Sequence, residues 1–413
     1  MTHSINTRLA TEGGVLVVGG GPVGLVTALG LARRGIPVTV VERESDVYRA
    51  PRAMGYHWSA LYGLDDLGLL EPMLERGFAA DGFKFLIRAT QETLSFSTSP
   101  LVANVAHPFS LTLGQDQFAD IVVDHLRAMP HVEIRWRTEA AALDQDGDQV
   151  VVTTGSGERI AAPWLVAADG ASSRIRGLAG LDFQGLTWPH NFIATNVRSD
   201  SFAPLGLADN NYVIDPEYGS VVARITKDGL WRVTWAEDAT LPDEGVLERI
   251  HDFLVGFLPD GAEYELTDYS RYRMHQRAAS SMRVGRVLLA GDAAHATNPT
   301  SGFGLVGGLH DSYILAEALA AVSRGEVGDS VLDTYGHDRL TAFWTVSSPM
   351  STESKRLVFH SDDPDRLEID LQMLRRVARD PALLAGFWSG GSRIESPSVV
   401  TGEYLSRGRN EIA

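Results

Sequence analysis

GRVLLAGDAAHATNPTSGFGLVGGLHD, residues 285–311, is the stretch that indicates the fold and a binding site together. It begins as a short apolar strand at residues 287–289, breaks at Gly291 and Asp292, and crosses a Pro/Gly loop into an Ala/Leu-rich helix near residues 309–321. A buried strand, a turn with a carboxylate and a glycine-rich approach to a helix indicate a ligand site at the carboxyl end of a sheet. The alternative is an ordinary strand–loop–helix joint whose glycines serve only the turn.

The residue types within this stretch suit a ligand with hydroxyl groups and negative charge. Asp292 can accept hydrogen bonds from ligand hydroxyls. The glycines let backbone N–H groups approach a ligand closely, and the positive end of the following helix favours negative charge there. These glycines are Gly302, Gly304, Gly307 and Gly308.

The composition bounds the class of protein. The 413 residues allow two or three domains, and a hydrophobic content of 44% is enough for substantial cores. A net charge of −17 argues against nucleic acid or an anionic membrane as a partner. The absence of cysteine excludes disulfides, thiolate catalysis and cysteine-ligated metals, and no metal site is expected.

The sequence also indicates where the protein resides. No apolar run approaches the length of about 20 residues that a membrane-spanning helix needs. The apolar residues 15–18 lead directly into glycines, which is unlike a signal peptide. We therefore expect a cytoplasmic protein that does not cross a membrane.

The N-terminal stretch GVLVVGGGPVGLVTALGLARRGIPVTVVE, residues 14–42, predicts a strand, a turn, a helix and a second strand. Gly19, Gly21 and Gly24 fit the pattern G-x-G-x-x-G, whose glycines permit a tight turn, the approach of a pyrophosphate and close helix–strand packing. Glu42 ends the second strand, where an acid can bind a ribose diol. Together these features predict a dinucleotide site, without distinguishing a nicotinamide cofactor from FAD.

Two further features follow along the chain: a third strand that ends at a carboxylate, and a long segment rich in predicted strands. The strand predicted at residues 164–168 leads to Asp169, another carboxylate beside a glycine. Residues 181–275 are rich in strand-like segments with interleaved aromatic residues. In LWRVTWAED, residues 230–238, aromatic and apolar residues alternate with Arg232 and Thr234, which predicts an antiparallel sheet with one buried and one solvated face.

The three strand-end signals, in this order, resemble the fingerprints of a known family. GGGPVG with Glu42, then ADGASSRIR, then GRVLLAGDAAHATNPTSGFG are similar to the motifs of single-component FAD-dependent aromatic hydroxylases, the p-hydroxybenzoate hydroxylase-like flavoprotein monooxygenases. The similarity extends over most of residues 14–340 and includes Arg52 and Gln115.

The resemblance implies FAD bound in an extended form. Gly19, Gly21 and Gly24 would lie at the pyrophosphate, Glu42 at the adenosine ribose and Asp292 at the ribityl chain. The segment facing the isoalloxazine ring would contain Pro299, Gly302, Gly304, Leu305 and Val306. The remaining expected cofactor-binding residues are Arg52, Gln115 and Asp169. At Val306 many family members carry an asparagine, so this chain lacks one side-chain contact and offers a backbone N–H instead.

The pattern of strands and helices, together with this resemblance, predicts a domain organisation within an α/β fold. A discontinuous Rossmann-like FAD-binding domain is expected at residues 1–75, 111–180 and 276–345. An inserted, mainly antiparallel β-sheet domain for the substrate is expected at 76–110 and 181–275. C-terminal helices and a tail would occupy 346–413, with the helical pattern ending near residue 379. A pocket is expected between the two domains.

The chemistry implied by the resemblance is hydroxylation of a small electron-rich aromatic ring, phenolic or hydroxypyridine-like. NADPH or NADH reduces the flavin, O₂ adds to give a C4a-hydroperoxide, and OH is transferred to the ring. Tyr212 and Arg224, on strands of the inserted domain, are the candidate substrate-contacting residues. Weaker candidates are His190, Tyr218 and His275, whereas His295 is expected to be structural.

Other interpretations of the same sequence remain open. A flavin-dependent halogenase shares the fold, but LWRVTWAED does not match the W-x-W-x-I-P stretch of that family. An FAD-dependent reductase or dehydrogenase acting on a lipid or isoprenoid double bond is a second alternative, and a non-enzymatic FAD-binding escort is a third. The choice of nicotinamide cofactor, the particular ring, and a monomeric or homodimeric state are not determined by the sequence.

Overall fold

The centre of the protein is a mainly parallel sheet. The computed structural model describes residues 7–9, 13–102 and 105–404. The sheet has the order β19-β20-β13-β2-β3-β9, and the edge strand β19 pairs antiparallel with β20. Its strands are β2 (Val15–Val18), β3 (Val38–Val41), β9 (Val132–Arg135), β13 (Trp164–Ala167), β19 (Arg283–Val284) and β20 (Val287–Leu289).

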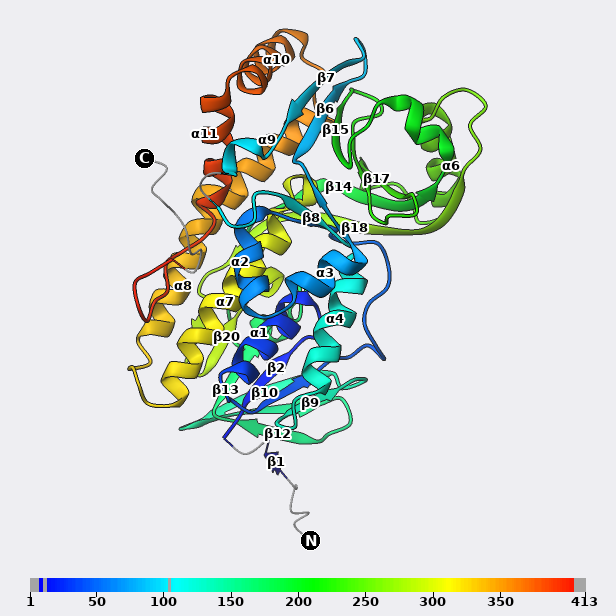
Figure 1. Cartoon of the computed structure of the whole chain (residues 1–413). Helices are drawn as coiled ribbons and strands as arrows, with labels where there is room; N and C mark the ends of the chain where they lie inside the picture. Colours follow the sequence, from blue (N-terminus) through cyan, green and yellow to red (C-terminus); the bar gives the residue numbers. More distant parts are fainter. Residues whose placement is uncertain (1–6, 10–12, 103–104, 405–413) are drawn as a thin grey trace.

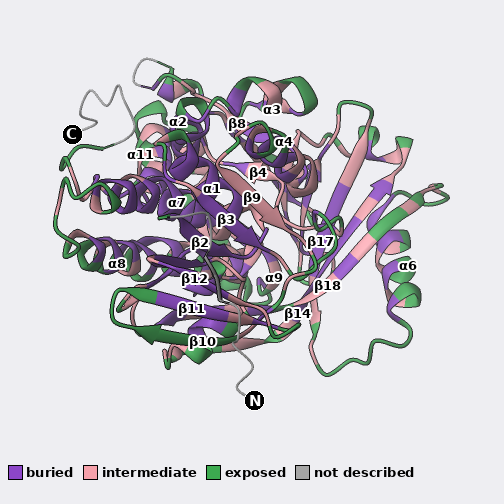
Figure 2. Ribbon diagram, turned by 90° about the horizontal axis from the view of Figure 1, so that it is seen from below, coloured by how far each residue is buried: buried purple, intermediate pink, exposed green. Residues whose placement is uncertain are grey.

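Layers on both faces of this sheet explain why its central strands are buried throughout. Every residue of β2 and β3 is buried, as expected for parallel strands covered on both sides. Helices α1 (Pro22–Arg33), α4 (Gln115–Arg127) and α7 (Phe303–Ser323) pack over one face, and a smaller sheet of order β1-β12-β11-β10 lies on the other (Figures 1 and 2). The smaller sheet comprises β1 (Thr7–Leu9), β10 (Ala140–Asp146), β11 (Gln149–Thr154) and β12 (Arg159–Ala162). The strand–helix–strand unit predicted at residues 14–42 is confirmed.

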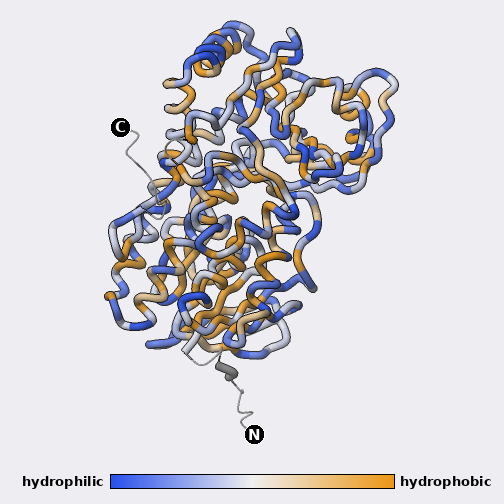
Figure 3. Tube along the Cα trace, viewed as in Figure 1, coloured by the Kyte–Doolittle hydropathy of each residue, from blue (hydrophilic) through white to orange (hydrophobic). Residues whose placement is uncertain are grey.

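Helix α7 is the main apolar helix of this body. It begins at Phe303, earlier than the predicted start near residue 309, because the glycine-rich segment is already helical. By length and composition it could span a membrane, but 83% of its most apolar window is buried inside the protein. Such burial is typical of a core helix, and Figure 3 shows the apolar segments concentrated in the interior around it.

A second, larger sheet stands beside this body. Its order is β21-β18-β14-β17-β16-β15-β6-β7, and its pairings are antiparallel except where β6 runs parallel to β15. The mainly antiparallel sheet predicted from the sequence is therefore confirmed. Its strands are β6 (Phe83–Ile87), β7 (Glu92–Phe96), β14 (Phe183–Arg198), β15 (Asn210–Ile214), β16 (Ser220–Arg224), β17 (Leu230–Asp238), β18 (Glu265–Ala279) and β21 (His295–Ala296).

The two faces of the large sheet have different roles. Helix α6 (Val246–Phe257) covers the outer face, where Ile250 and Leu254 pack with Val222 and Val233 (Figure 1). The other face turns toward the parallel-sheet body. The prediction of a solvated polar face on β17 is wrong, because Arg232 on that face is only 3% exposed.

The C-terminal helices lie against the large sheet. α9 (Ser348–Phe359) contacts β15 and β16, and α10 (Pro364–Arg379) packs on β7. The predicted end of helical structure near residue 379 is wrong, because α11 (Pro381–Ser392) follows immediately. Asp380 explains this new helix, since its side chain accepts hydrogen bonds from the first backbone N–H groups of α11.

The remaining elements connect these layers. A small sheet of order β4-β8-β5 lies near α2 and α3. Helix α8 precedes a short π-helical segment that leads into α9. The bounds are β4 (Gly55–Tyr56), β5 (Phe78–Ala80), β8 (Ser110–Thr112), α2 (Trp58–Asp66), α3 (Leu70–Arg76), α5 (Arg174–Leu178) and α8 (Val331–Ala342).

The carboxylate of Asp311, fully buried within α7, joins segments that lie far apart in the sequence. Its Oδ2 accepts hydrogen bonds from the backbone N–H of Gly291 and from His295 Nε2, both at 2.8 Å. Its Oδ1 accepts one from Arg339 Nε at 2.7 Å, and Arg339 also donates to the carbonyl of Ile394 at 2.6 Å. One buried charge network therefore holds the turn after β20, α7, α8 and the C-terminal segment.

We expect Asp311→Asn to lower the free energy of unfolding by about 3–5 kcal/mol, because it leaves Arg339 buried without its charged partner. Urea-induced unfolding measures this loss. Burial alone would raise the pKa of Asp311, but His295 and Arg339 outweigh it and hold that pKa well below its usual range. The stabilisation is therefore present above about pH 4, the ordinary value, and is lost as the pH falls toward the lowered one.

The matched control is Asp148→Asn, which removes a carboxylate that is 99% exposed and pairs with Arg286 at 2.8 Å. An exposed ion pair contributes about 0–1 kcal/mol, so this variant should unfold nearly as the wild type does. Equal losses in the two variants would contradict the role assigned to Asp311.

Candidate active site

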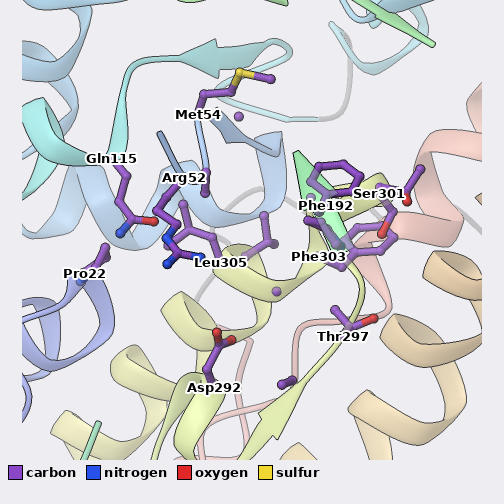
Figure 4. Close-up of a pocket in the computed structure, with 18 of the residues that line it drawn as sticks. Pro22, Arg52, Met54, Gln115, Phe192, Asp292, Thr297, Ser301, Phe303 and Leu305 are labelled. Atoms are coloured by element: carbon purple, nitrogen blue, oxygen red, sulfur yellow. The ribbon is translucent and has the colours of Figure 1, made fainter. Parts of the chain in front are cut away.

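A continuous cavity of about 1080 Å³ lies between the carboxyl end of the parallel sheet and the large sheet. Its lining comes from the turn after β2, the N-terminus of α7, strands of the large sheet, and helices α9 and α11. Pockets for single small molecules usually measure about 300–1,000 Å³, so this cavity has room for a dinucleotide and a further ring. Figure 4 shows polar side chains, among them Asp292 and Gln115, in one part of it and Phe192 and Phe303 in another.

The glycines after β2 form a cradle that side chains would fill. A Cβ on Gly19, which has φ +117°, would lie 2.3 Å from the carbonyl oxygen of Ala168, and one on Gly24 would lie 2.0 Å from that of Gly19. Both positions therefore require glycine for close packing. Gly21 lines the cavity and has no protein atom within 4 Å of an added Cβ, so its surroundings are open to a ligand.

The N-terminus of α1 strengthens this cradle as an anion site. Gly21 is the N-cap residue, no side chain caps the helix, and its first turn has no acidic residue. The first backbone N–H groups of α1 are therefore available to a phosphate, which the helix dipole also favours.

Two of the predicted acidic residues line the cavity and also have partners within the protein. Glu42 accepts hydrogen bonds from the backbone N–H groups of Gly20 at 2.5 Å and Glu44 at 2.8 Å, which fixes the carboxylate beside the glycine turn. Asp169 accepts from Ser173 Oγ at 2.5 Å and from the backbone N–H of Arg174 at 2.8 Å, and so caps α5. Asp169 therefore has a structural function in addition to its place in the wall.

Asp292 and the N-terminus of α7 form the middle of the cavity. The Asp292 carboxylate is open to this deep cavity, and burial raises its pKa. The residues Pro299, Gly302, Gly304, Leu305 and Val306, all predicted to face a flavin ring, line the cavity together. No side chain caps α7, whose N-cap Gly302 has φ +75°, and the buried hydroxyl of Thr300 has no hydrogen-bond partner among the described residues. These free donors suit the carbonyl and nitrogen acceptors of a flavin.

The predicted residues Arg52 and Gln115 lie across from this helix end (Figure 4). The Arg52 guanidinium stacks over the ring of Tyr272 at 4.4 Å and near that of Tyr48 at 5.3 Å. Gln115 is the first residue of α4, and its backbone N–H donates to the carbonyl of Ala53 at 3.1 Å. Both side chains are half-buried and within the cavity wall.

Beyond these residues the cavity is bounded by an aromatic wall. We use this term for Phe83, Phe85, Phe96, Phe387 and Trp388, which come from β6, β7 and α11 and contact one another at 5.0–6.0 Å between ring centroids. All of them except Phe96 line the cavity directly. Such edge-to-face surroundings favour a planar aromatic ligand.

Tyr212 stands at the edge of the aromatic wall. Its ring lies 5.0 Å from Phe83 and 5.4 Å from Phe85, and the residue lines the cavity. Burial raises the pKa of Tyr212 to about 12, so the hydroxyl stays protonated at neutral pH. Within the described residues the hydroxyl has no hydrogen-bond partner, which leaves it available to a substrate.

Arg224 does not share this place, and its prediction as a substrate-contacting residue is corrected by the sheet register. Tyr212 pairs with Val221, and paired residues point to the same face of a sheet. Arg224 lies three residues after Val221, so its side chain points to the opposite face. There it pairs with Asp209 at 2.6 Å and covers the ring of Phe78. Arg224 is not among the residues that line the cavity.

Arg232 is the buried cation that sequence reasoning missed. It lines the cavity from β17, donates to Asn196 Oδ1 at 2.9–3.0 Å and to the backbone carbonyl of Arg52, and burial lowers its pKa to about 10. The alternation of residues along β17 could have identified it, because this alternation places Arg232 on the same face as Thr234. Thr234 pairs with Val221 and Val221 with Tyr212, so Arg232 and Tyr212 share that face.

The weaker histidine and tyrosine candidates differ in whether they line the cavity. His275 lines the cavity and hydrogen-bonds Thr187 at 2.9 Å. His190 and Tyr218 are not part of its wall. His295 is bound to Asp311, as expected for a structural residue.

A glycine cradle and helix ends for a dinucleotide, joined to an aromatic chamber, define a protein that brings a nucleotide cofactor to a ring-shaped ligand. The FAD binding domain family matches residues 12–348 of the chain. The chain therefore belongs to this family, whose cofactor is FAD.

Two similar proteins are named for monooxygenase activity. The chain is 40% identical over 398 residues to para-nitrophenol 4-monooxygenase of Pseudomonas sp. (strain WBC-3), covering 95% of this chain and 98% of that protein. It is 39% identical over 370 residues to 6-hydroxy-3-succinoylpyridine 3-monooxygenase HspB of Pseudomonas putida (strain DSM 28022 / S16), covering 89% and 94%. Both relatives are named as monooxygenases of an aromatic substrate, which is the class of activity that the sequence motifs predicted.

Solved structures agree with this classification. p-Nitrophenol 4-monooxygenase PnpA from Pseudomonas putida DLL-E4 superposes with a TM-score of 0.88 at 37% identity, covering 94% of this chain and 99% of that one. Aklavinone-11 hydroxylase, solved in a ternary complex with FAD and aklavinone, superposes with a TM-score of 0.74 at 25% identity, covering 88% and 71%. The predicted α/β fold and the FAD cofactor are thereby confirmed.

We expect Asp292→Ala to weaken FAD binding about 10- to 100-fold, because hydrogen bonds to a charged acceptor contribute about 1.5–3 kcal/mol. The ratio of flavin to protein absorbance after gel filtration measures this loss. Asp260→Ala, which removes an exposed carboxylate beyond the end of α6, is the control and should retain its FAD. Full retention of FAD by Asp292→Ala would remove this carboxylate from the cofactor site.

Proposed function

We propose that the protein is an NAD(P)H-consuming monooxygenase that hydroxylates a small phenolic or hydroxypyridine-like ring. The observation that carries this proposal is the continuity of the FAD site with the aromatic wall in one cavity. The relatives named for nitrophenol and hydroxypyridine substrates support the same class of ring. A cytoplasmic location, a monomeric or homodimeric state and either NADPH or NADH as reductant belong to the same proposal.

The cofactor supplies reduction by NAD(P)H and the activation of O₂. The protein contributes position, charge and the exclusion of water. The uncapped N-terminus of α7, which carries Leu305 and Val306 into the cavity wall, would stabilise negative charge on a flavin ring bound beside it. The aromatic wall holds the substrate flat and keeps water from the reacting carbon.

Two polar groups prepare the substrate in this proposal. A phenol reacts faster as a phenolate, because the ring carbon is then more electron-rich. The buried Arg232 guanidinium favours that negative charge within the cavity. The Tyr212 hydroxyl, protonated at neutral pH, donates a hydrogen bond to the substrate oxygen and fixes its orientation.

The direct test is anaerobic stopped-flow reduction of the bound flavin by NADPH and by NADH, alone and with phenols, nitrophenols and hydroxypyridines. We expect one compound to accelerate bleaching by orders of magnitude, which would identify the substrate class. Equal bleaching without any aromatic compound would instead favour a reductase. A flavin that neither NADPH nor NADH reduces would contradict the proposal.

Tyr212→Phe should lower hydroxylation about tenfold and raise hydrogen peroxide release, because loss of one hydrogen bond leaves the ring misplaced. Oxygen uptake compared with product formation measures this uncoupling. Arg224→Gln is the matched control, since that side chain lies on the opposite face of the same sheet. It should keep wild-type coupling, and unchanged coupling in Tyr212→Phe would exclude Tyr212 from the substrate site.

A further inference from the structure

His57 has a position that the mechanism above does not use. It is the N-cap residue of α2, with extended backbone angles φ −64° and ψ 146°, and its ring lines the cavity. Nδ1 accepts a hydrogen bond from the backbone N–H of Ser59 at 3.3 Å and lies 2.9 Å from Ser59 Oγ. We assign the ring proton to Nε2, because this tautomer lets Nδ1 accept from the backbone N–H of Ser59.

The Nε2 end of the ring lies among aromatic groups. The His57 ring centroid is 6.1 Å from that of Phe303 at the start of α7 and 5.9 Å from that of Trp388 on α11. A Cβ on Gly391 would approach Nε2 to 3.1 Å, so the glycine keeps this nitrogen uncovered. No residue in the described part of the chain accepts a hydrogen bond from Nε2.

Burial makes this donor a neutral one. The apolar surroundings lower the pKa of His57 to about 3, so the imidazole carries no charge at physiological pH. A neutral ring with its proton fixed on Nε2 is a poor base for a phenol. It is instead a directional donor that does not change across the working pH range.

Helix capping alone does not account for a histidine here. Asn, Asp, Ser and Thr are the preferred N-cap residues, and each would cap α2 without placing a second nitrogen in the cavity. Phe83 connects this nitrogen with the substrate region, because its ring contacts Tyr212 at 5.0 Å and Trp388 at 5.6 Å. His57 and Tyr212 therefore adjoin the same aromatic wall.

We propose that His57 is a specificity-determining residue whose Nε2–H donates a hydrogen bond to an oxygen substituent of the aromatic substrate. The inference rests on the proposed function, since it concerns the ring that the aromatic wall holds. The preferred substrates are then rings with an acceptor such as a nitro, carbonyl or phenolate oxygen. Rings with only apolar substituents leave this buried donor unpaired and bind more weakly.

Two substitutions separate the capping function of His57 from its donor function. His57→Asn keeps an oxygen that can cap α2 but removes the donor from the cavity. His57→Gln places an amide N–H near the position of Nε2 and loses the cap. Both variants and the wild type are prepared with FAD bound, and flavin content and melting temperature are recorded for each.

The probe is 4-nitrophenol, titrated into the oxidised holoenzyme and followed by the change in flavin absorption, so that no turnover is needed. We expect His57→Asn to raise the dissociation constant about tenfold with little change in melting temperature, as for one lost hydrogen bond. His57→Gln should bind within about threefold of the wild type although its melting temperature falls by several degrees.

Equal binding by His57→Asn and wild type overturns the inference and leaves the proposed function intact. Weak binding by both variants that follows their melting temperatures overturns it too, because the effect is then structural. Should the wild type bind neither 4-nitrophenol nor any phenol or hydroxypyridine of the panel, the proposed substrate class fails and the inference fails with it.

Discussion

The buried carboxylate of Asp311 is the interaction on which the arrangement of the site depends. Its partners are the backbone of Gly291 and the ring of His295, both from the turn after β20, and the guanidinium of Arg339 from α8. The turn that carries Asp292 is thus fixed to α7, whose N-terminus lines the cavity. Because an isolated buried charge is costly, the network forms only when all these segments are in place, which couples cofactor-site geometry to complete folding.

Strand register determines which side chains reach the substrate. In the large sheet, one set of alternate residues packs under α6 and the other forms part of the cavity. A polar residue in the second set is buried although no apolar core surrounds it, as for Arg232. The alternation of residues along β17 was therefore predicted correctly. The error was to expect solvent at the face that instead lines the cavity.

The sequence was sufficient for the features that depend on local patterns. The cofactor cradle could be predicted because Gly19, Gly24 and the flanking strands lie within one short segment. Arg224 was misassigned because the sequence does not show that Tyr212 pairs with Val221, and only this pairing places Arg224 on the opposite face of the sheet. His57 was not anticipated, since its significance arises from Trp388 and Gly391, more than three hundred residues away and meeting it only in the folded chain. Helix α11 was missed because the Gly/Ser content of its sequence concealed the Asp380 cap.

Helices α9 to α11 lie almost wholly after residue 348, where the match to the FAD binding domain family ends, yet they supply part of the cavity wall. The glycine cradle after β2 and the helices that close the aromatic chamber from this side therefore occupy separate stretches of the sequence. Substitutions in α9 to α11 would therefore change the shape of the aromatic chamber and leave the glycine cradle unchanged. Such a division would let the preference for one aromatic ring over another change through substitutions confined to one end of the coding sequence.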